Sequence, residues 1–466
     1  EECIEYSIIL AEKVGLELNI PVYLYEKSAI FPSRENLASI REGEYEGLEQ
    51  KLKDKNWKPD FGPTKFNKSA GATVIGCREF LIAYNINLNT TDKRLATDIA
   101  FEIREAGRSK RKKNPKSSNL LDGEIIRHKN GSPIKVPGKF KCVKAIGWYV
   151  SEYNRAQISI NFTNFKISPI YQVFDSVCDL AIERGLRVTG SELVGLIPKS
   201  ALIDAGKYYL KKQGRSLGVS ESDILECAVQ SLGLNDVSKF NYKEKIIEFA
   251  IEDKKDSLLH LSTDDLIHSI SQNSPAPGGG SVSALAGALG AALLSMVSLL
   301  TYDKKEYFSK RKKMSRLGEM AHKYQKRLKE LVDEDTHAFD SVMDASRLPE
   351  KSKSEIKFKK QELFKAYKIA TDTPLEIAII SLEIIKLSID LIKYGNPNSV
   401  TDAHVAAEVG LAGVRGGCVN VMINLSSFDK ISDYDAKIEE KIECLLKESN
   451  RLHRKAFTLT KKIIKE

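Results

Sequence analysis

The residues with the clearest capacity for chemistry lie in the second half of the chain, in Leu331-Val-Asp-Glu-Asp-Thr-His-Ala-Phe339. The apolar spacing predicts a helix, and Val332, Asp335 and Phe339 then share one face at steps of three and four residues. If Val332 and Phe339 face a core, Asp335 faces it too. Burial favours the neutral form of a carboxylate and lets it exchange protons near neutral pH, as general acid–base catalysis requires. A solvated acidic turn accounts for the same residues and is the commoner case.

Other polar segments lie in the same half. Gly278-Gly279-Gly280 stands directly before an apolar run, where it is either a flexible joint or a set of backbone N–H groups that face an anion; the joint is the commoner use. The segment from Gly395 to Asp402 breaks one helix and caps the next, which is the default role of such residues. Asn420 and Asn424 lie one helical turn apart among apolar residues, and their amides need partners, either a ligand or another helix.

In the first half, a loop from Asp60 to Gly71 carries Lys65, Phe66 and Lys68 directly before a predicted strand. An aromatic ring beside cations suits a flat, anionic ligand. Taken alone, this pattern is weak, because many loops share the composition.

The elements that must position these residues differ between the two halves. The first half mixes strand and helix periods, which predicts an α+β architecture. The predicted strands are 21–25, 71–76, 80–88, 141–150 and 156–162, and the predicted helices are 4–16, 94–105 and 170–184. From residue 262 onward the spacing is helical, over 310–345, 351–394, 401–425 and 435–465, so we predict an all-α helical bundle. Pro374 should kink or split the second of these long helices.

The apolar run Val282–Leu300 has no charged residue and is long enough to cross a membrane. Its many Gly, Ala and Ser residues would let other helix backbones approach closely, and long amphipathic helices follow it. We therefore interpret it as a buried central helix of the bundle. The segment Glu252–Ser257 has no apolar residue and suits a linker between the two halves.

Composition limits the classes of protein. The 466 residues carry 72 Lys and Arg against 63 Asp and Glu, and the net charge of +9 suits a small anionic ligand as well as a nucleic acid. The basic run Arg108–Lys116 begins a predicted loop that extends to Gly138. It has no interleaved aromatic residues and no nucleic-acid-binding motif, so we interpret it as solvated. The seven cysteines are scattered without a C-x-x-C motif, which predicts neither disulfides nor a zinc site and favours the cytoplasm.

Taken together, these segments resemble the bifunctional formimidoyltransferase-cyclodeaminase family, through motifs along essentially the whole chain. In the first half the motifs are Gly43-Glu-Tyr-Glu46, Pro59-Asp-Phe-Gly-Pro63, Gly71-Ala-Thr-Val74, Phe80–Leu88, Ala145-Ile-Gly-Trp-Tyr149 and Gly190–Pro198. In the second half they are Ala276–Ser281, Val332-Asp-Glu-Asp335, Arg347-Leu-Pro349, Gly395-Asn396 and Asn420–Asn424.

The resemblance implies a transferase of two α/β-sandwich subdomains at residues 1–80 and 81–249, a linker at 250–257, and an all-α cyclodeaminase domain at 258–466. It implies transfer of a formimino group from N-formimidoyl-L-glutamate to tetrahydrofolate, then ring closure of 5-formimidoyltetrahydrofolate to 5,10-methenyltetrahydrofolate with release of ammonia. Tetrahydrofolate, with or without a polyglutamate tail, is the co-substrate. We expect no metal, no nucleic acid and no membrane span, and a homo-oligomer.

Site residues follow from the same resemblance. The family's catalytic cyclodeaminase aspartate maps to Asp335. Its folate-contacting loop maps to Gly62, Pro63, Thr64, Lys65, Phe66, Asn67, Lys68, Ser69, Ala70 and Gly71. We expect other residues of the cyclodeaminase pocket among Gly278, Gly279, Gly280, Asn396, Asp402, Asn420 and Asn424.

One part of the family pattern has no counterpart here. The chain begins Glu-Glu-Cys-Ile without an initiator Met, and the resemblance places the catalytic transferase histidine in a motif upstream of this point. The one histidine before residue 250 is His128, in the polar insertion. We therefore expect the chain as given to retain ring closure but not formimino transfer. Two alternatives are a methenyltetrahydrofolate cyclohydrolase and a non-catalytic helical scaffold whose basic α+β part binds an anionic polymer.

Overall fold

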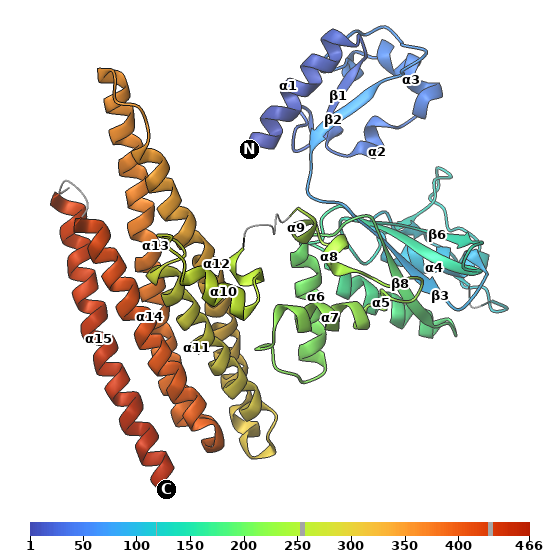
Figure 1. Cartoon of the computed structure of the whole chain (residues 1–466). Coiled ribbons are helices and arrows are strands. Elements are labelled where there is room, and N and C mark those ends of the chain that lie inside the picture. The colour runs from blue at the N-terminus through green and yellow to red at the C-terminus, as the bar shows by residue number, and fades with distance from the viewer. Residues whose placement is uncertain (118, 252–256, 427–431) are drawn as a thin grey trace. The chain divides into compact units, whose positions relative to one another are not determined.

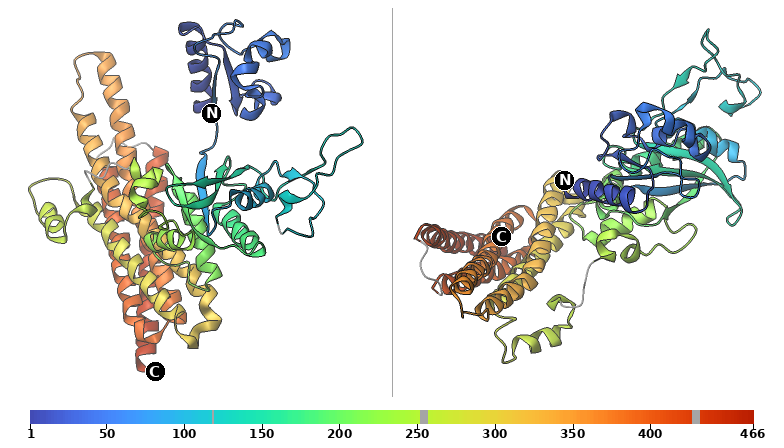
Figure 2. Two further views of the ribbon diagram at one scale, coloured as in Figure 1. Left: turned by 90° about the vertical axis from the view of Figure 1, so that its right-hand side faces the viewer. Right: turned by 90° about the horizontal axis from the view of Figure 1, so that it is seen from above.

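The computed structural model describes residues 1–117, 119–251, 257–426 and 432–466. These residues form two compact units. The first contains Glu1–Ala201 and Gly233–Lys239, and the second contains Leu202–Leu232 and Phe240–Glu466. The division does not coincide with the predicted linker at 250–257, whose residues 252–256 lie outside the described part of the chain. Figures 1 and 2 show strands and helices in the first unit and helices in the second.

The first two strands form a small parallel sheet with helices on both faces. β1 (Val22–Glu26) pairs in parallel with β2 (Thr73–Cys77). Side chains alternate along a strand, so Val22 and Leu24 pack with Ala11 of α1 (Glu2–Glu17), whereas Tyr23 packs on the other face with Ile40. That face is covered by α2 (Leu37–Ile40) and α3 (Glu44–Lys53), with the short 3₁₀ helices η1 (Pro32–Arg34) and η2 (Lys55–Trp57) beside them.

A four-stranded antiparallel sheet follows, in the order β6-β7-β3-β8. Its strands are β3 (Ile82–Leu88), β6 (Val143–Val150), β7 (Arg155–Phe162) and β8 (Val188–Val194), and α4 (Lys93–Ile103) and α5 (Ile170–Glu183) cover its apolar face. Gly147 lies on that face, where an added Cβ would meet the backbone of α4. Polar side chains point from the opposite face. The sequence predicted every strand of this sheet except β8, because Thr189, Gly190 and Ser191 interrupt its apolar alternation.

The predicted loop between α4 and β6 is partly structured. β4 (Arg108–Ser109) and β5 (Lys135–Val136) pair antiparallel, and further bridges join Arg111 to Ile125 and Arg127 to Pro133. η3 (Leu120–Asp122) lies between the two arms. The loop interpretation is therefore wrong for these residues. The segment is rich in Lys and Arg, and strands of two residues are too short to show an alternating apolar pattern. These strands could therefore not be predicted from the sequence.

The described elements from α6 onward are all helical. They are α6 (Lys199–Lys212), α7 (Glu221–Ser231), α8 (Tyr242–Lys245), α9 (Ile247–Ala250), η4 (Leu258–His260), α10 (Thr263–Ile270), α11 (Gly279–Tyr302), η5 (Lys305–Lys310), α12 (Arg311–Ser346), α13 (Lys353–Tyr394), η6 (Pro397–Ser399), α14 (Val400–Ser426) and α15 (Ser432–Lys465). The helices α11–α15 form a bundle around one apolar core (Figure 1). The predicted helical C-terminal region is confirmed.

The apolar helix α11 lies at the centre of the bundle and packs against α12, α13 and α14. It is not fully buried, however, because Val282, Leu289, Met296 and Leu300 are exposed. By length and composition alone, α11 and the segment Pro397–Ser426 could each span a membrane, and about half of each is buried in the protein. A core helix of a water-soluble protein passes the same test, so this observation is weak evidence for a membrane.

The helix α13 runs without interruption through Pro374, so the predicted split is wrong. A proline inside a helix leaves the carbonyl four residues earlier without its N–H partner. Here that carbonyl belongs to Ala370, and Nδ2 of Asn424 in α14 donates a hydrogen bond to it at 2.5 Å. The neighbouring helix thus replaces the donor that Pro374 lacks.

Candidate functional site

Asp335 of α12 lies against the first turn of α11. The Ser281 hydroxyl donates to Oδ2 of Asp335 at 3.3 Å and lies 3.2 Å from the Thr336 hydroxyl. Burial raises the pKa of the Asp335 carboxyl, while hydrogen bonds from the Ser281 hydroxyl and backbone N–H lower it in part. Asp335 therefore has the two properties of a proton-transfer group, a fixed position and a pKa shifted towards neutrality.

The three glycines lie at the start of α11, and one of them, Gly280, has a role that neither sequence interpretation included. Gly278 is the N-cap residue and Gly279 begins the helix. A Cβ added to Gly280 would lie 2.1 Å from Oδ1 of Asp335, well inside van der Waals contact. Because Gly280 has no side chain, the Asp335 carboxyl can occupy the space beside the N-terminus of α11.

The two asparagines of α14 divide between this site and the fold. Nδ2 of Asn420 donates to the Gly416 carbonyl of its own helix at 2.8 Å, and a Cβ on Gly279 would lie 3.4 Å from the same nitrogen. Asn420 is therefore close to the first turn of α11. Nδ2 of Asn424 donates to the Ala370 carbonyl, so this amide has a partner on another helix, which is one of the two roles that the sequence left open.

Asn396 and Asp402 lie at the opposite end of α11. The backbone N–H of Asn396 donates at 2.9 Å to the hydroxyl of Thr301, near the last residue of that helix. Gly280 and Thr301 are about 32 Å apart along α11 at 1.5 Å per residue. The prediction that Asn396 and Asp402 share one pocket with Asp335 is therefore wrong within a single chain. Asn396 instead caps η6, where its side chain accepts from the Asn398 N–H.

The carboxylates next to Asp335 have structural partners. Asp333 accepts hydrogen bonds at 2.8 Å from the Ser257 hydroxyl and the Leu258 N–H, and so anchors the segment before α10. Glu334 pairs with Arg327, which also binds Glu376. Among these three carboxylates, Asp335 alone faces α11, as the spacing predicted.

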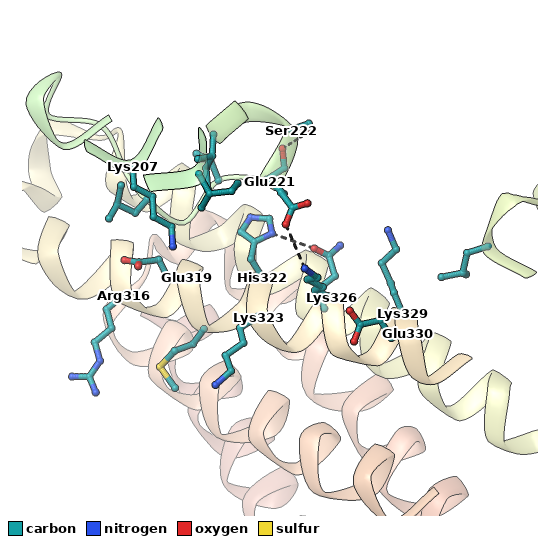
Figure 3. A pocket seen from close by; sticks show the side chains of 18 of the residues that line it. Lys207, Glu221, Ser222, Arg316, Glu319, His322, Lys323, Lys326, Lys329 and Glu330 are labelled. Atoms are coloured by element: carbon teal, nitrogen blue, oxygen red, sulfur yellow. Dashed lines mark hydrogen bonds and ion pairs between the residues drawn. The ribbon is translucent and has the colours of Figure 1, made fainter. Parts of the chain in front are cut away.

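A cavity in the second unit has ionic side chains in its lining, but Asp335 is not among them. It has a volume of about 1130 Å³ and is bordered at one end by Asp333. Its ionic lining consists of Lys207, Arg316, Lys323, Lys326 and Lys329 against Glu221, Glu319, Glu330 and Asp333. Figure 3 shows Lys326 meeting Glu221, an ion pair of 3.5 Å, while Arg316 and Lys323 extend away from it. These charges nearly balance, so the cavity has no marked preference for an anion.

In the first unit, the predicted folate loop is held by its own side chains. Oδ1 of Asn67 accepts from the N–H groups of Ser69 and Ala70, and the Tyr45 hydroxyl donates to the Lys68 carbonyl at 2.6 Å. The Phe66 ring packs on Tyr45 and belongs to the apolar cluster behind β1. The side chains of Lys65 and Lys68 remain exposed. Phe66 therefore anchors the loop, and the lysines are its free cations.

The loop begins at a buried ion pair that the sequence analysis did not single out. Arg34 and Asp60 lie 2.6 Å apart, and each side chain is 2% exposed. Arg34 also donates to the carbonyls of Asn56 and Lys58, and Asp60 accepts from the Leu24 N–H. The pair thus fixes the residues that lead into the loop.

The fold and the site define a class of protein, a chain with an α/β part followed by a helical bundle in which a half-buried carboxyl lies against the first turn of a helix. Three family descriptions match successive parts of the chain. "Formiminotransferase domain, N-terminal subdomain" matches residues 1–78, "Formiminotransferase domain" matches 83–252, and "Formiminotransferase-cyclodeaminase" matches 262–444. The mouse formimidoyltransferase-cyclodeaminase is 38% identical over 452 residues, which cover 96% of this chain and 78% of that protein.

The chain therefore belongs to the formimidoyltransferase-cyclodeaminase family, and it contains both the transferase and the cyclodeaminase domains. Single-domain relatives match its halves. The glutamate formimidoyltransferase of Thermoplasma acidophilum is 39% identical over 228 residues, covering 48% of this chain and 64% of that protein. The methenyltetrahydrofolate cyclohydrolase of Methylorubrum extorquens is 33% identical over 192 residues, covering 41% of this chain and 92% of that protein.

The matches also bear on the expectation that part of the transferase is absent. The N-terminal transferase subdomain matches residues 1–78, and the second transferase domain follows it directly. The comparisons therefore do not support a loss of transferase activity.

Proposed function

We propose that the helical domain closes 5-formimidoyltetrahydrofolate to 5,10-methenyltetrahydrofolate and releases ammonia, with Asp335 as the proton-transfer group. The observation that carries this proposal is the half-buried Asp335 carboxyl, which lies against the first turn of α11 and whose pKa is raised by burial. The family match over 262–444 supports the reaction class.

In this reaction N10 of the folate adds to the amidine carbon, and the carbon–nitrogen bond to the amino group then breaks. N10 must lose a proton and the departing nitrogen must gain one before it leaves as ammonia. The Asp335 carboxylate takes the first proton and, as a carboxylic acid, delivers it to the leaving nitrogen. Holding N10 beside the amidine carbon supplies the rest of the rate enhancement through proximity.

The test is Asp335→Asn, which keeps the size of the side chain and removes its titratable proton. We expect ammonia release to fall by about 10²- to 10⁴-fold, the usual contribution of a general acid–base group. The helical circular-dichroism signal should not change. A variant that turns over within a few-fold of the parent would exclude Asp335 as the proton carrier.

We also propose that the first half transfers the formimino group from N-formimidoyl-L-glutamate to tetrahydrofolate, with folate on the Gly62–Gly71 loop and its anionic tail near Lys65 and Lys68. The matches to both transferase descriptions and to a glutamate formimidoyltransferase support this. The assay follows formimidoylglutamate consumption and methenyltetrahydrofolate formation separately on the same preparation. Ring closure without any consumption would instead support the sequence-based expectation that this chain cyclises only.

A cyclohydrolase activity is the alternative that a specific observation favours, namely the similarity of the helical domain to a methenyltetrahydrofolate cyclohydrolase. The two reactions differ in the product that is lost. Ammonia release from 5-formimidoyltetrahydrofolate supports cyclodeamination, whereas hydrolysis of 5,10-methenyltetrahydrofolate without ammonia release supports the alternative.

We further propose that the protein is a cytoplasmic homo-oligomer that associates through α11 and α14. These neighbouring helices each expose apolar side chains, Val282, Leu289, Met296 and Leu300 on α11 and Val405, Val419 and Ile423 on α14. Several exposed apolar side chains on neighbouring helices usually mark a surface that contacts another protein chain. The absence of a disulfide among the described residues suits a reducing compartment.

A further inference from the structure

The polar face of the β6-β7-β3-β8 sheet carries a hydrogen-bonded network that the sequence motifs did not reveal. The residues that alternate away from α4 and α5 include Asn85 and Asn87 on β3, Gln157 and Ser159 on β7, and Glu192 on β8. Asn87 is 0% exposed and Gln157 is 1% exposed. Buried amides in the middle of a sheet are costly unless each is satisfied.

The two buried amides are satisfied by a chain of hydrogen bonds across the strands. The Trp148 indole N–H donates to Oε1 of Gln157 at 3.0 Å, and Nε2 of Gln157 donates to Oδ1 of Asn87 at 2.6 Å. Nδ2 of Asn87 then donates to Oδ2 of Asp236 at 2.9 Å, and Arg155 binds the same oxygen at 2.6 Å. This series of hydrogen bonds fixes the orientation of the Gln157 and Asn87 amides. It ends at Asp236, whose charge is neutralised by Arg155.

Glu192 is the exception in the network. Its carboxylate accepts only long hydrogen bonds from neutral groups, at 3.4 Å from Nδ2 of Asn85, 3.4 Å from Nε2 of Gln157 and 3.2 Å from the Tyr153 hydroxyl. Among the residues that the structure describes, no Lys, Arg or His forms an ion pair with it, in contrast to Asp236. A half-buried carboxylate with three weak neutral donors is suited to a cationic ligand.

The neighbouring positions on this face of the sheet are mostly neutral. On the same face, the register places Asn85, Ser159 and Ile146 in one row with Glu192, and Ala83, Asn161 and Lys144 in the next row with Val194. The exposed Lys144 lies three strands from β8, about 14 Å across at the usual strand spacing. The face is thus negative at one edge and positive at the other.

We propose that this face binds the formimino donor, with the amidinium of N-formimidoyl-L-glutamate on the Glu192 carboxylate. An amidinium is a planar cation with two parallel N–H donors, and a carboxylate binds such a fork in a bidentate manner. This inference rests on the proposed transferase function.

The experiment measures binding to the full chain by isothermal titration calorimetry, with two ligands. N-Formimidoyl-L-glutamate carries the cation, and N-formyl-L-glutamate has the same shape and carboxylates but no positive charge. We expect the parent protein to bind the formimidoyl ligand at least about tenfold more tightly, and Glu192→Gln to abolish that preference. The matched control is Glu152→Gln, an exposed glutamate beside the same sheet, which should keep the preference.

The outcomes separate this inference from the function on which it rests. If the parent prefers the formimidoyl ligand and Glu192→Gln keeps that preference, Glu192 is not the amidinium site, while the transferase proposal stands. If the parent binds both ligands equally, the face does not select a cation and the inference is wrong. If the parent binds neither ligand, the transferase proposal fails together with the inference. A melting temperature of Glu192→Gln within a few degrees of the parent shows that the variant is folded.

Discussion

At the scale of single residues, the spacing of the sequence predicted that Asp335 would face the interior, and it does. The sequence did not show which residues would contact the Asp335 carboxyl. Ser281 and Gly280 are more than fifty residues away along the chain and reach Asp335 only because α11 begins beside α12. These contacts are properties of the packed helices, so the local pattern indicated the direction of the pKa shift of Asp335 but not the groups that contact its carboxyl.

The raised pKa of Asp335 has a consequence for stability. A buried acid whose pKa lies above its unfolded value stabilises the fold in its neutral form, and this contribution is lost as the pH rises through the folded-state pKa. Asparagine resembles the neutral acid at every pH. We therefore expect Asp335→Asn to raise the free energy of unfolding at pH 8, and to have a smaller effect at pH 5. Urea denaturation at both pH values measures this, and an equal effect at both would contradict the raised pKa.

Gly280 offers a test of the site that leaves Asp335 unchanged. A Cβ at this position would lie 2.1 Å from the carboxyl, so Gly280→Ala must displace Asp335. Since a shift of about 1 Å can cost on the order of 10² in rate, we expect ammonia release to drop to that extent. Gly278→Ala is the matched control, because its added Cβ would come no closer than 3.2 Å to the Pro275 carbonyl oxygen. Equal activity of the two variants would show that the fit at Gly280 is unimportant.

At the scale of elements, most helices and strands of both halves were predictable because each buries one periodic apolar face. The errors have physical causes. Pro374 was expected to interrupt α13, and the compensating donor comes from Asn424 on another helix. The sequence left the role of Asn424 open, since an amide among apolar residues has the same sequence signature whether its partner is a ligand or a carbonyl.

The pairing of Pro374 with Asn424 can be measured by a double-mutant cycle. Asn424→Ala leaves the buried Ala370 carbonyl without a donor, which should cost about 1–3 kcal/mol of unfolding free energy. In the Pro374→Ala background, the restored backbone N–H can bond the same carbonyl within α13. We expect Asn424→Ala to cost much less there. Additive effects of the two substitutions in chemical denaturation would show that they do not act on the same carbonyl.

At the scale of the whole molecule, composition and motifs predicted a two-part chain, and the family matches agree with that order. The separation of Asn396 and Asp402 from Asp335 was not predictable, because motif order along the chain does not give position along a helix of about 36 Å. The exposed apolar side chains of α11 were also missed, since a run that is apolar all round predicts burial on every side.

The proposed association through α11 and α14 predicts a change in assembly. We expect Leu289→Lys combined with Val419→Lys to lower the oligomeric mass, because two desolvated charges would oppose association. Ile464→Lys is the control, since Ile464 is equally exposed but lies at the end of α15. Size-exclusion chromatography with light scattering gives the mass directly. A double variant that keeps the parent mass would place the interface elsewhere.

The Arg34–Asp60 pair has a consequence for the loop that follows it. The pair fixes the entry to the Gly62–Gly71 segment, Phe66 holds its middle, and the hydrogen bonds of Asn67 close its end. A ligand that binds a preorganised loop need not order it, so little conformational entropy opposes association. Recognition of the proposed folate at this loop would therefore follow a rigid-body docking mode, and the temperature factors and amide exchange rates of the loop would hardly differ between the free and the bound protein.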